Sequence, residues 1–259
     1  MSSLRRNAFW LLPIAALVLL LAIWQVYVDA GGVSQLVLPS PHKVLVALVD
    51  DRGTLWHNLK ASGTEILLGI LVAGLLGFSA AVVIHLWTPV RVSVYPLLVA
   101  SQAIPVVTLA PLLTLWLGFG LLPKLVVIGL VCFFPIVVTT LAGFETVDPE
   151  LVKLMRTFDA SRLEIFRRVE LPSALPGLFT GLKLAAVFAV IGDVFAEQAG
   201  SNSGLGYLLN ATLANLETAE AFATVFVLSA FAILLFALLS VIERRALPWV
   251  YQAKVISSR

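Results

Sequence analysis

Long apolar stretches separated by short polar segments dominate this chain. A helix of roughly twenty apolar residues spans a hydrocarbon core of about 30 Å, and six stretches reach that length. They cover residues 9–28, 62–86, 94–117, 122–144, 176–198 and 219–242. Proline and glycine occur within several of them, which membrane helices tolerate when neighbours satisfy the freed carbonyls. The pattern predicts an all-α integral membrane protein with about six transmembrane helices, forming one domain over residues 1–259.

The polar segment 145–175, between the fourth and fifth stretches, carries helix signals that a solvated connection does not need. Asp148 followed by Pro149 is typical of a helix start. Ser161 with Glu164 three residues later forms a capping box, which is a second start signal. We therefore expect two short helices within this segment.

These two helices are expected over residues 149–158 and 162–169, and they meet near Asp159. The second helix repeats apolar residues at a spacing of three, namely Leu163, Phe166 and Val169. An apolar face on an aqueous loop is typical of an interaction site. The segment is thus predicted to dock a soluble partner.

Two local patterns predict further helix contacts. Ser40 and Pro41 are typical of an N-cap followed by the first residue of a helix. We therefore expect residues 41–49 to form a short helix on the membrane surface. In the second apolar stretch a small residue recurs at every fourth position, which lets helices approach closely. This stripe consists of Gly69, Ala73, Gly77 and Ala81, and it predicts that this helix lies inside the bundle.

Composition excludes several classes of protein. Of the 259 residues, 60% are apolar and 12% are charged, whereas a soluble domain has about 25% charged residues. A net charge of +2 is too small to indicate nucleic-acid binding. The single cysteine, Cys132, lies in an apolar run, and His42, His57 and His85 are scattered without metal-ligand spacing. We expect no disulfide, no metal site and no nucleic-acid partner.

The distribution of Lys and Arg predicts the orientation. Arg5 and Arg6 precede a stretch too long for a signal peptide, so we interpret it as the first span. With the N-terminus inside, the cytoplasmic segments hold Arg5, Arg6, Arg91, Lys153, Arg156, Arg162, Arg167, Arg168, Arg244, Arg245, Lys254 and Arg259, and the external segments hold Lys43, Arg52, Lys60 and Lys124. Positive charge accumulates on the cytoplasmic side, so both termini and segment 145–175 are expected there.

Polar side chains at membrane depth are costly and mark functional sites. Asp193 and Glu197 lie four residues apart, hence on one helical face, and Ser101 and Gln102 lie in the third stretch. We predict that these four residues line a translocation path. For Glu65, near the end of its stretch, an interfacial or bundle-internal hydrogen bond is the preferred interpretation, with a place in the path as the alternative.

Nucleotide-binding motifs are missing from the chain. No G-x-x-x-x-G-K-[ST] sequence occurs, and the glycine-rich run at residues 200–207 lacks the required Lys. We expect that the chain is not an enzyme and binds no cofactor. Any ATP hydrolysis that drives it must occur on another polypeptide.

The end of segment 145–175, V-E-L-P at Val169–Pro172, resembles the EAA loop of permease subunits of bacterial ATP-binding-cassette (ABC) importers. That pattern reads E-A-A, three residues, G, nine residues, I-x-L-P. Here the triplet position is Lys153-Leu154-Met155 and the glycine position is Asp159, so both depart from the pattern. Aspartate can adopt the left-handed conformation that glycine supplies. The resemblance implies that the ATPase-coupling residues are Lys153, Leu154, Met155, Arg156, Asp159, Ala160, Ser161, Leu163, Phe166, Val169, Leu171 and Pro172.

Further motifs are similar to the nitrate/sulfonate/taurine-type branch of these permeases. They are L-P-S-P (38–41), A-P-L-L-T-L-W-L-G-F-G (110–120), C-F-F-P-I-V-V (132–138), L-P-S-A-L-P-G-L (171–178) and S-G-L-G-Y (203–207). The resemblance implies a type I importer permease fold with cytoplasmic coupling helices, in the bacterial inner membrane. It also implies a second permease copy, a nucleotide-binding subunit dimer that carries ATP and Mg, and an extracytoplasmic substrate-binding protein.

Two short motifs indicate the class of substrate. S-Q-A-I-P (101–105) and F-A-E-Q-A-G (195–200) resemble permeases for thiamine-precursor pyrimidines. Amide and carboxylate groups suit a hydrogen-bonding heterocycle better than a sulfonate, which carboxylates repel. Import of a sulfonate, taurine or nitrate is the alternative. A more remote one is an ion-coupled secondary transporter that uses Asp193 and Glu197, although no inverted repeat is evident.

Overall fold

The computed structural model describes the backbone of residues 3–250 and the side chains of Leu12 and residues 15–250. Within this part of the chain every regular element is a helix and no strand occurs, so the all-α prediction is confirmed. In chain order the elements are α1 (Ser3–Asp29), α2 (Pro41–Asp50), α3 (Arg52–Leu86), α4 (Thr88–Ser101), α5 (Val106–Leu117), α6 (Leu121–Glu145), α7 (Pro149–Thr157), α8 (Arg162–Ile165), a π-helical turn (Phe166–Glu170), α9 (Leu171–Gln198), α10 (Leu205–Ala214) and α11 (Thr218–Ala246).

Four helical segments are long and apolar enough to cross a membrane. They are α3, α6, α11 and the run from Arg162 to Gln198 that contains α9, and they contain the second, fourth, fifth and sixth predicted stretches. The first stretch, 9–28, lies within α1, whose apolar part with described side chains, Ala15–Asp29, is shorter than a span. Its role as a span stays a prediction, and the side chains of Arg5, Arg6, Lys254 and Arg259 lie outside the described residues.

The third predicted stretch, 94–117, is not one helix. It is divided between α4 and α5, whose axes differ by 96°. Pro105 stands at the start of α5 with an extended backbone (φ −72°, ψ 106°). Proline lacks an amide proton and disfavours helical conformation in the preceding residue. The stretch is a bent helix pair because Pro105 ends the helix at the residues before it, and its role as one span stays a prediction.

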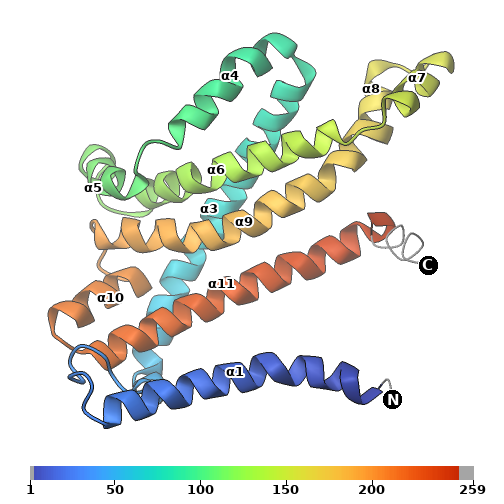
Figure 1. Ribbon diagram of the computed structural model, residues 1–259. Coiled ribbons are helices and arrows are strands. Elements are labelled where there is room, and N and C mark those ends of the chain that lie inside the picture. Colours follow the sequence, from blue (N-terminus) through green and yellow to red (C-terminus); the bar gives the residue numbers. More distant parts are fainter. Residues whose placement is uncertain (1–2, 251–259) are drawn as a thin grey trace.

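The core lies where α6, α9 and α3 pack together, with α6 and α9 in contact along most of their lengths (Figure 1). The stripe of Gly69, Ala73, Gly77 and Ala81 is buried, as predicted. A Cβ at Gly77 would lie 2.9 Å from the Ile136 side chain of α6. Small residues thus allow α3 to approach α6 closely.

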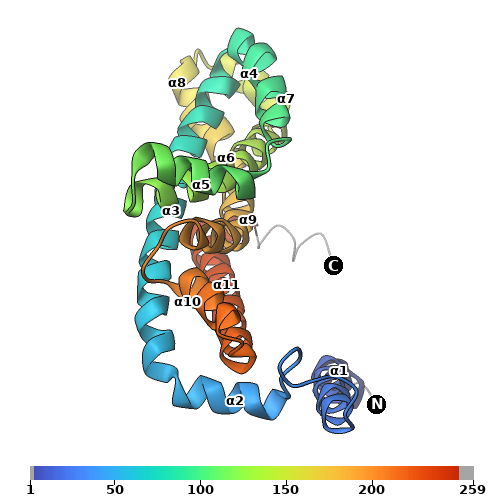
Figure 2. The same ribbon diagram turned by 90° about the vertical axis from the view of Figure 1, so that its left-hand side faces the viewer.

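The short helix predicted after Ser40 is present as α2, and its position on the membrane surface stays a prediction. The Ser40 side chain accepts a hydrogen bond from the amide of Lys43, and Pro41 is the first helical residue. Figure 2 shows that α2 connects α1, which stands apart from the other helices, to α3. Trp24 of α1 approaches Phe222 of α11, with ring centroids 6.0 Å apart.

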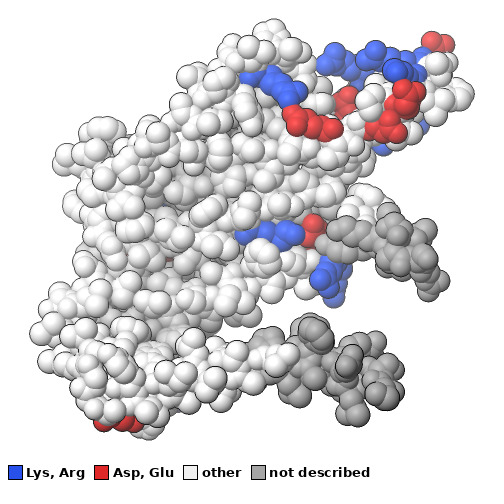
Figure 3. Space-filling view, in the orientation of Figure 1, with Lys and Arg blue, Asp and Glu red and all other residues white. Residues whose placement is uncertain are grey.

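The two ends of the bundle differ in charge. The α7–α8 segment, the start of α1 and the end of α11 lie at one end, and α5 and α10 lie at the other (Figure 1). On the face shown in Figure 3, Lys, Arg, Asp and Glu gather over the α7–α8 end, and a broad band of the face is free of charged side chains. Between α9 and α11, Lys183 and Glu243 form a mostly buried ion pair at 2.7 Å. A band without charged side chains beside a strongly charged end is the charge pattern of a membrane protein.

Candidate functional site

The α7–α8 segment begins with the capping signals expected from the sequence. The Asp148 side chain accepts a hydrogen bond from the Glu150 amide at 2.9 Å. Ser161 and Glu164 form the capping box, in which each side chain bonds the other residue's backbone amide. These contacts satisfy amides that the first helical turn leaves free, so both helix starts are determined locally.

Asp159 joins the two helices in a left-handed conformation, with φ of 54°. The prediction that Asp159 adopts the left-handed conformation in place of glycine is therefore confirmed. The turn is held by backbone hydrogen bonds, including Ala160 N to Met155 O at 3.1 Å. Asp159 itself is exposed, so the conformation is maintained by the turn and not by packing of its side chain.

Replacing Asp159 by glycine is expected to stabilise the protein. The left-handed conformation costs an L-residue about 1 kcal/mol, which glycine avoids. The melting temperature in detergent is expected to rise by roughly 2–4 °C. Asp148→Gly is the control, because Asp148 has an ordinary φ of −69° and caps α7. An equal rise in both variants, or a fall in Asp159→Gly, would contradict the strain argument.

The second predicted helix of the segment, 162–169, is not a separate element. It runs through α8 and the π-helical turn Phe166–Glu170 directly into α9. Leu171 and Pro172 are the first residues of α9. A proline ring clashes with the carbonyl four residues earlier in an α-helix, and a π-helical turn widens the backbone at that point. The helix therefore continues past Pro172, where a break had been expected.

Apolar residues on α7 form an exposed face. Leu151, Leu154 and Phe158, at spacings of three and four, are all exposed, and Phe158 is exposed to 76%. We call these three residues the α7 apolar face. Sequence reasoning had named Leu154 but had missed Leu151 and Phe158. The same spacing argument, applied to α7 as well as to α8, would have found them.

Phe166 is half-buried and packs against the bundle. Its ring stacks on Phe144 of α6 with centroids 6.1 Å apart, and Phe144 stacks on His85 of α3 at 4.1 Å. His85 Nε2 lies 3.0 Å from Glu170 Oε2. Of the three apolar residues predicted to form one docking face, Leu163 is exposed, whereas Phe166 and Val169 are half-buried. Phe166 instead connects the segment to α6 and α3.

The charged residues of the segment are mostly solvent-facing. Lys153 and Arg156 are exposed, and Lys153 pairs with Glu150 at 2.8 Å. Arg162 donates a hydrogen bond to the Leu86 carbonyl at the end of α3. Exposed ion pairs contribute little to stability. These side chains are thus available to a partner at little cost to the fold.

A second group of predicted residues lies at the opposite end of the bundle. Asp193 and Glu197 share a face of α9, as predicted, and both are completely buried. Glu65 of α3 joins them, and ligand oxygens of the three carboxylates lie within 4.8 Å of one another. We call these three residues the carboxylate cluster. Sequence reasoning missed Glu65 as a member, since nothing local indicates that α3 crosses α9 at this height.

Several donors hold Glu197 in place. Its Oε1 accepts a hydrogen bond from the Ser62 hydroxyl at 2.7 Å, and its Oε2 accepts one from the Gly206 amide at 2.5 Å. Gly204, with φ of 112°, leaves no room for a Cβ beside the Glu197 carboxylate. The turn before α10 therefore requires glycine, and the S-G-L-G-Y run is anchored to α9 by Glu197.

Lys124 of α6 reaches the same cluster. Its ammonium group lies 2.7 Å from Glu65 Oε1 and 2.8 Å from the Ser201 hydroxyl. Both oxygens of Asp193 and Oε2 of Glu65 have no hydrogen-bond partner among the residues that the structure describes. Within the cluster, Glu65 is thus paired with Lys124 and Glu197 is hydrogen-bonded, whereas Asp193 has no hydrogen-bond partner among the described residues.

Ser101 and Gln102 lie away from this cluster, at the break between α4 and α5, where both are exposed. Gln102 lines a cavity of about 500 Å³ together with residues of α6 and α9. The other lining residues are Val131, Phe134, Pro135, Val138, Thr139, Leu184 and Phe188. Of the four residues predicted to line one path, Gln102 lines this surface cavity, Ser101 is exposed and does not line it, and Asp193 and Glu197 lie in the interior.

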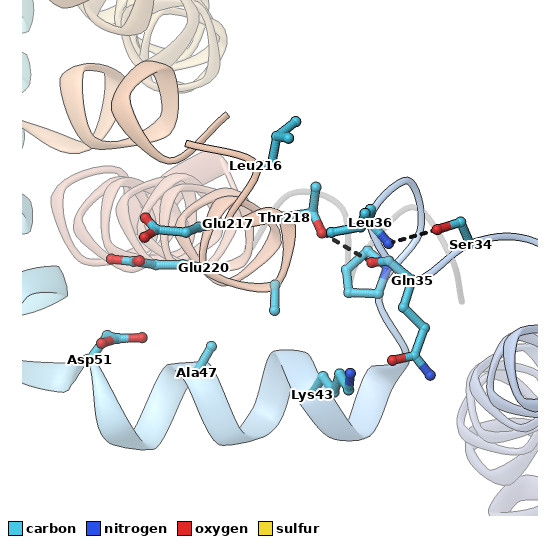
Figure 4. A pocket seen from close by; sticks show the side chains of 12 residues that line it. Ser34, Gln35, Leu36, Lys43, Ala47, Asp51, Leu216, Glu217, Thr218 and Glu220 are labelled. Carbon is cyan, nitrogen blue, oxygen red and sulfur yellow. Dashed lines mark hydrogen bonds between the residues drawn. The ribbon is translucent and has the colours of Figure 1, made fainter. Parts of the chain in front are cut away.

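A further pocket of about 530 Å³ opens between α2 and the start of α11. Figure 4 shows Asp51, Glu217 and Glu220 gathered on one side of it, and Lys43 further along α2. The Thr218 hydroxyl donates a hydrogen bond to the Gln35 carbonyl at 3.1 Å, which closes one edge. This end of the molecule thus presents an acidic hollow.

Comparison with known proteins gives consistent results. Residues 66–250 match the family described as binding-protein-dependent transport system inner membrane component. The chain is 35% identical over 247 residues to the formylaminopyrimidine transport permease protein ThiX of Halalkalibacterium halodurans, covering 95% of this chain and 98% of the relative. It is 31% identical over 245 residues to the taurine transport system permease protein TauC of Escherichia coli, covering 92% and 89%. Among solved structures, an amino acid ABC transporter chain has the same fold, with a TM-score of 0.61 at 15% identity over 77% of this chain and 97% of that chain.

Proposed function

This chain belongs to the family of binding-protein-dependent transport system inner membrane components, and on that premise we propose that it imports a pyrimidine or similar neutral heterocycle. It is a multi-pass permease subunit of an ABC importer, in the nitrate/sulfonate/taurine branch near the thiamine-precursor permeases. ATP hydrolysis in such importers belongs to separate nucleotide-binding subunits. The relatives are named for formylaminopyrimidine and for taurine, so the substrate class must be argued from the residues.

The lining of the Gln102 cavity carries the argument for the substrate class. Gln102 and Thr139 offer neutral hydrogen-bonding groups, and Phe134 and Phe188 offer aromatic surface. No Lys or Arg occurs among the described residues that line it. A sulfonate or nitrate is bound best by a charged donor such as arginine. A flat heterocycle with amide-like edges needs only the groups that are present.

A second copy of the chain is proposed to complete the path. Apolar side chains of α9 that face out of the subunit beside the Gln102 cavity, among them Leu184, Phe188 and Ile191, are more than 40% exposed. In a membrane such a face packs well against another helix surface. Two copies facing each other would enclose the cavity between them, which gives a continuous route along the dimer interface.

The proposed orientation of the chain in the membrane is based on the distribution of its basic residues. The α7–α8 end carries Lys153, Arg156 and Arg162, so we place it in the cytoplasm. The nucleotide-binding subunits are proposed to dock there, on the α7 apolar face. The opposite end, with the acidic hollow between α2 and α11, faces outward and receives the substrate-binding protein.

The proposed mechanism is alternating access. ATP binding draws the two nucleotide-binding subunits together and moves the α7–α8 segments seated on them. Because α8 continues into α9, and Phe166 contacts Phe144 of α6, this movement reaches both helices that line the Gln102 cavity. Their tilt would open the cavity to one side of the membrane and then to the other.

The test is ATP hydrolysis by the reconstituted importer. The chain is co-expressed with the nucleotide-binding subunit and binding protein encoded beside it, and each candidate ligand is added in turn. We expect a pyrimidine to stimulate hydrolysis and to accumulate inside vesicles, with taurine, sulfonates and nitrate inactive. Stimulation by taurine would overturn the substrate class, and uptake by the chain alone down an ion gradient would overturn the ATP-driven mechanism.

Gln102→Ala is expected to lower uptake of the heterocycle about tenfold, which corresponds to the loss of roughly 1.4 kcal/mol of hydrogen bonding. Uptake into vesicles at limiting ligand measures the effect. Ser79→Ala is the control, because the Ser79 hydroxyl is exposed and bonds only its own helix at Leu75 O. Unchanged uptake in Gln102→Ala would show that this cavity is not on the path.

A further inference from the structure

The carboxylate cluster has the composition of a cation site, and we propose that Glu65, Asp193 and Glu197 bind one calcium ion. This inference goes beyond the transport function and does not depend on the substrate. It departs from the expectation of no metal site, which rested on the scattered histidines and the single cysteine and not on the carboxylates. It rests on the unpartnered oxygens, the net charge and the oxygen spacing of the cluster.

Asp193 is the clearest indication of a missing ligand. Its side chain is completely buried, and neither carboxylate oxygen has a hydrogen-bond partner among the described residues. Glu65 Oε2 is likewise buried without a partner. Buried charges in proteins are almost always paired or bound to a metal. The neighbouring carboxylates of Asp193 and Glu65 therefore present three buried oxygens without a partner among the described residues, which a bound cation would satisfy.

The charge balance favours a divalent ion. The cluster contains three carboxylates, and Lys124 supplies one positive charge that is already directed at Glu65 Oε1 and Ser201. Two negative charges are left over when all three carboxylates are ionised. A divalent cation neutralises them, whereas Na⁺ leaves one uncompensated in the interior.

The donors and their spacing suit calcium. All three ligand groups are carboxylates, and their oxygens lie within 4.8 Å of one another. Calcium binds oxygens at about 2.3–2.6 Å, so ligands on opposite sides are separated by up to about 5 Å. Magnesium binds at about 2.0–2.1 Å and retains several waters. This spacing accommodates calcium with direct carboxylate contacts.

Surrounding groups pre-orient the ligands. The Ser62 hydroxyl and the amides of Gly206 and Tyr207 fix the Glu197 carboxylate, and Lys124 fixes Glu65. Hydrogen bonds of this kind orient metal ligands and strengthen binding. The ion would join α3 to α9 beside the turn at residues 200–204, on the side to which we assign the binding protein.

The experiment uses the purified importer complex after treatment with a chelator. Calcium retained per chain is measured with ⁴⁵Ca²⁺, and thermal stability is measured in calcium, magnesium or sodium. We expect one calcium ion per chain and a melting temperature raised by roughly 5 °C at about a hundred times the dissociation constant. No retained calcium, or an equal rise in magnesium or sodium, would overturn the proposal.

Asp193→Asn separates loss of the ion from misfolding. The variant is expected to bind no calcium and to show no rise in melting temperature when calcium is added. Without calcium it is expected to melt at or above the temperature of the calcium-free wild type, because it lacks the uncompensated charge. Asp50→Asn, at an exposed carboxylate on α2, is expected to behave like the wild type. A calcium-dependent rise that persists in Asp193→Asn would show that the ion binds elsewhere.

Discussion

Phe158→Asp is expected to abolish ATP-driven transport while leaving the permease folded. Phe158 is the most exposed residue of the α7 apolar face, at 76%, so its replacement costs the isolated chain within about 0.5 kcal/mol. An aromatic residue at the centre of an interface contributes about 2–4 kcal/mol, and a carboxylate there adds a desolvation cost. Binding of the nucleotide-binding subunit should fall about a hundredfold or more.

Co-purification with the nucleotide-binding subunit and ligand-stimulated ATP hydrolysis measure this effect. Glu150→Gln is the control on the same helix, because Glu150 is exposed and only pairs with Lys153. Phe166→Asp provides the contrast, since it places a carboxylate in the stack with Phe144. It should lose transport and also lower the melting temperature. Full coupling in Phe158→Asp would mean that the partner docks elsewhere.

Gly177→Val is expected to prevent stable folding of the permease. A Cβ at Gly177 would overlap the Thr139 carbonyl of α6 and lie 3.1 Å from the Gly143 Cα. Both are backbone atoms, which cannot move without separating α6 from α9, the pair in most extensive contact. Overpacking of this kind costs about 3 kcal/mol or more, and small residues are what permit close packing in membranes.

The yield of monodisperse protein in detergent and its melting temperature report the outcome. Gly129→Val is the matched control, because Gly129 lies in α6 and no atom lies within 4 Å of the position that a Cβ would occupy there. It should change stability by about 1 kcal/mol or less. Normal yield and melting of Gly177→Val would show that α6 and α9 can separate without loss of the fold.

Features governed by local physics could be predicted from the sequence. Hydropathy over twenty residues located α3, α6, α9 and α11, because each must bury its own backbone polar groups in helix. The caps at Asp148 and Ser161 and the left-handed Asp159 depend only on neighbouring residues. The coupling role that the EAA-type pattern implies for this segment stays a prediction.

Features governed by the packing of distant segments could not be predicted from the sequence. For Glu65 an interfacial or bundle-internal hydrogen bond was expected, and it bonds Lys124 of α6. Its proximity to Asp193 was not predicted, since that depends on how α3 crosses α9. Phe166 was assigned to a docking face by its spacing from Leu163. Its actual contact is Phe144, which lies more than twenty residues earlier in the chain. The bend at Pro105 was also missed, because membrane spans often contain proline without breaking.

The continuity of α8, the π-helical turn and α9 has a mechanical consequence. Arg162 to Gln198 is one helical run of 37 residues, which at 1.5 Å per residue is about 55 Å long. A stiff rod of this length pivots about the place where it is gripped most tightly, its contact with α6 near Gly177 and Gly181. A tilt of about 10° then moves the two ends in opposite directions by several ångströms in total. With the α7–α8 segment docked as proposed, the docking end and the Glu197 end of this rod would swing in opposite directions. The proposed alternating access would then follow from the stiffness of one helix.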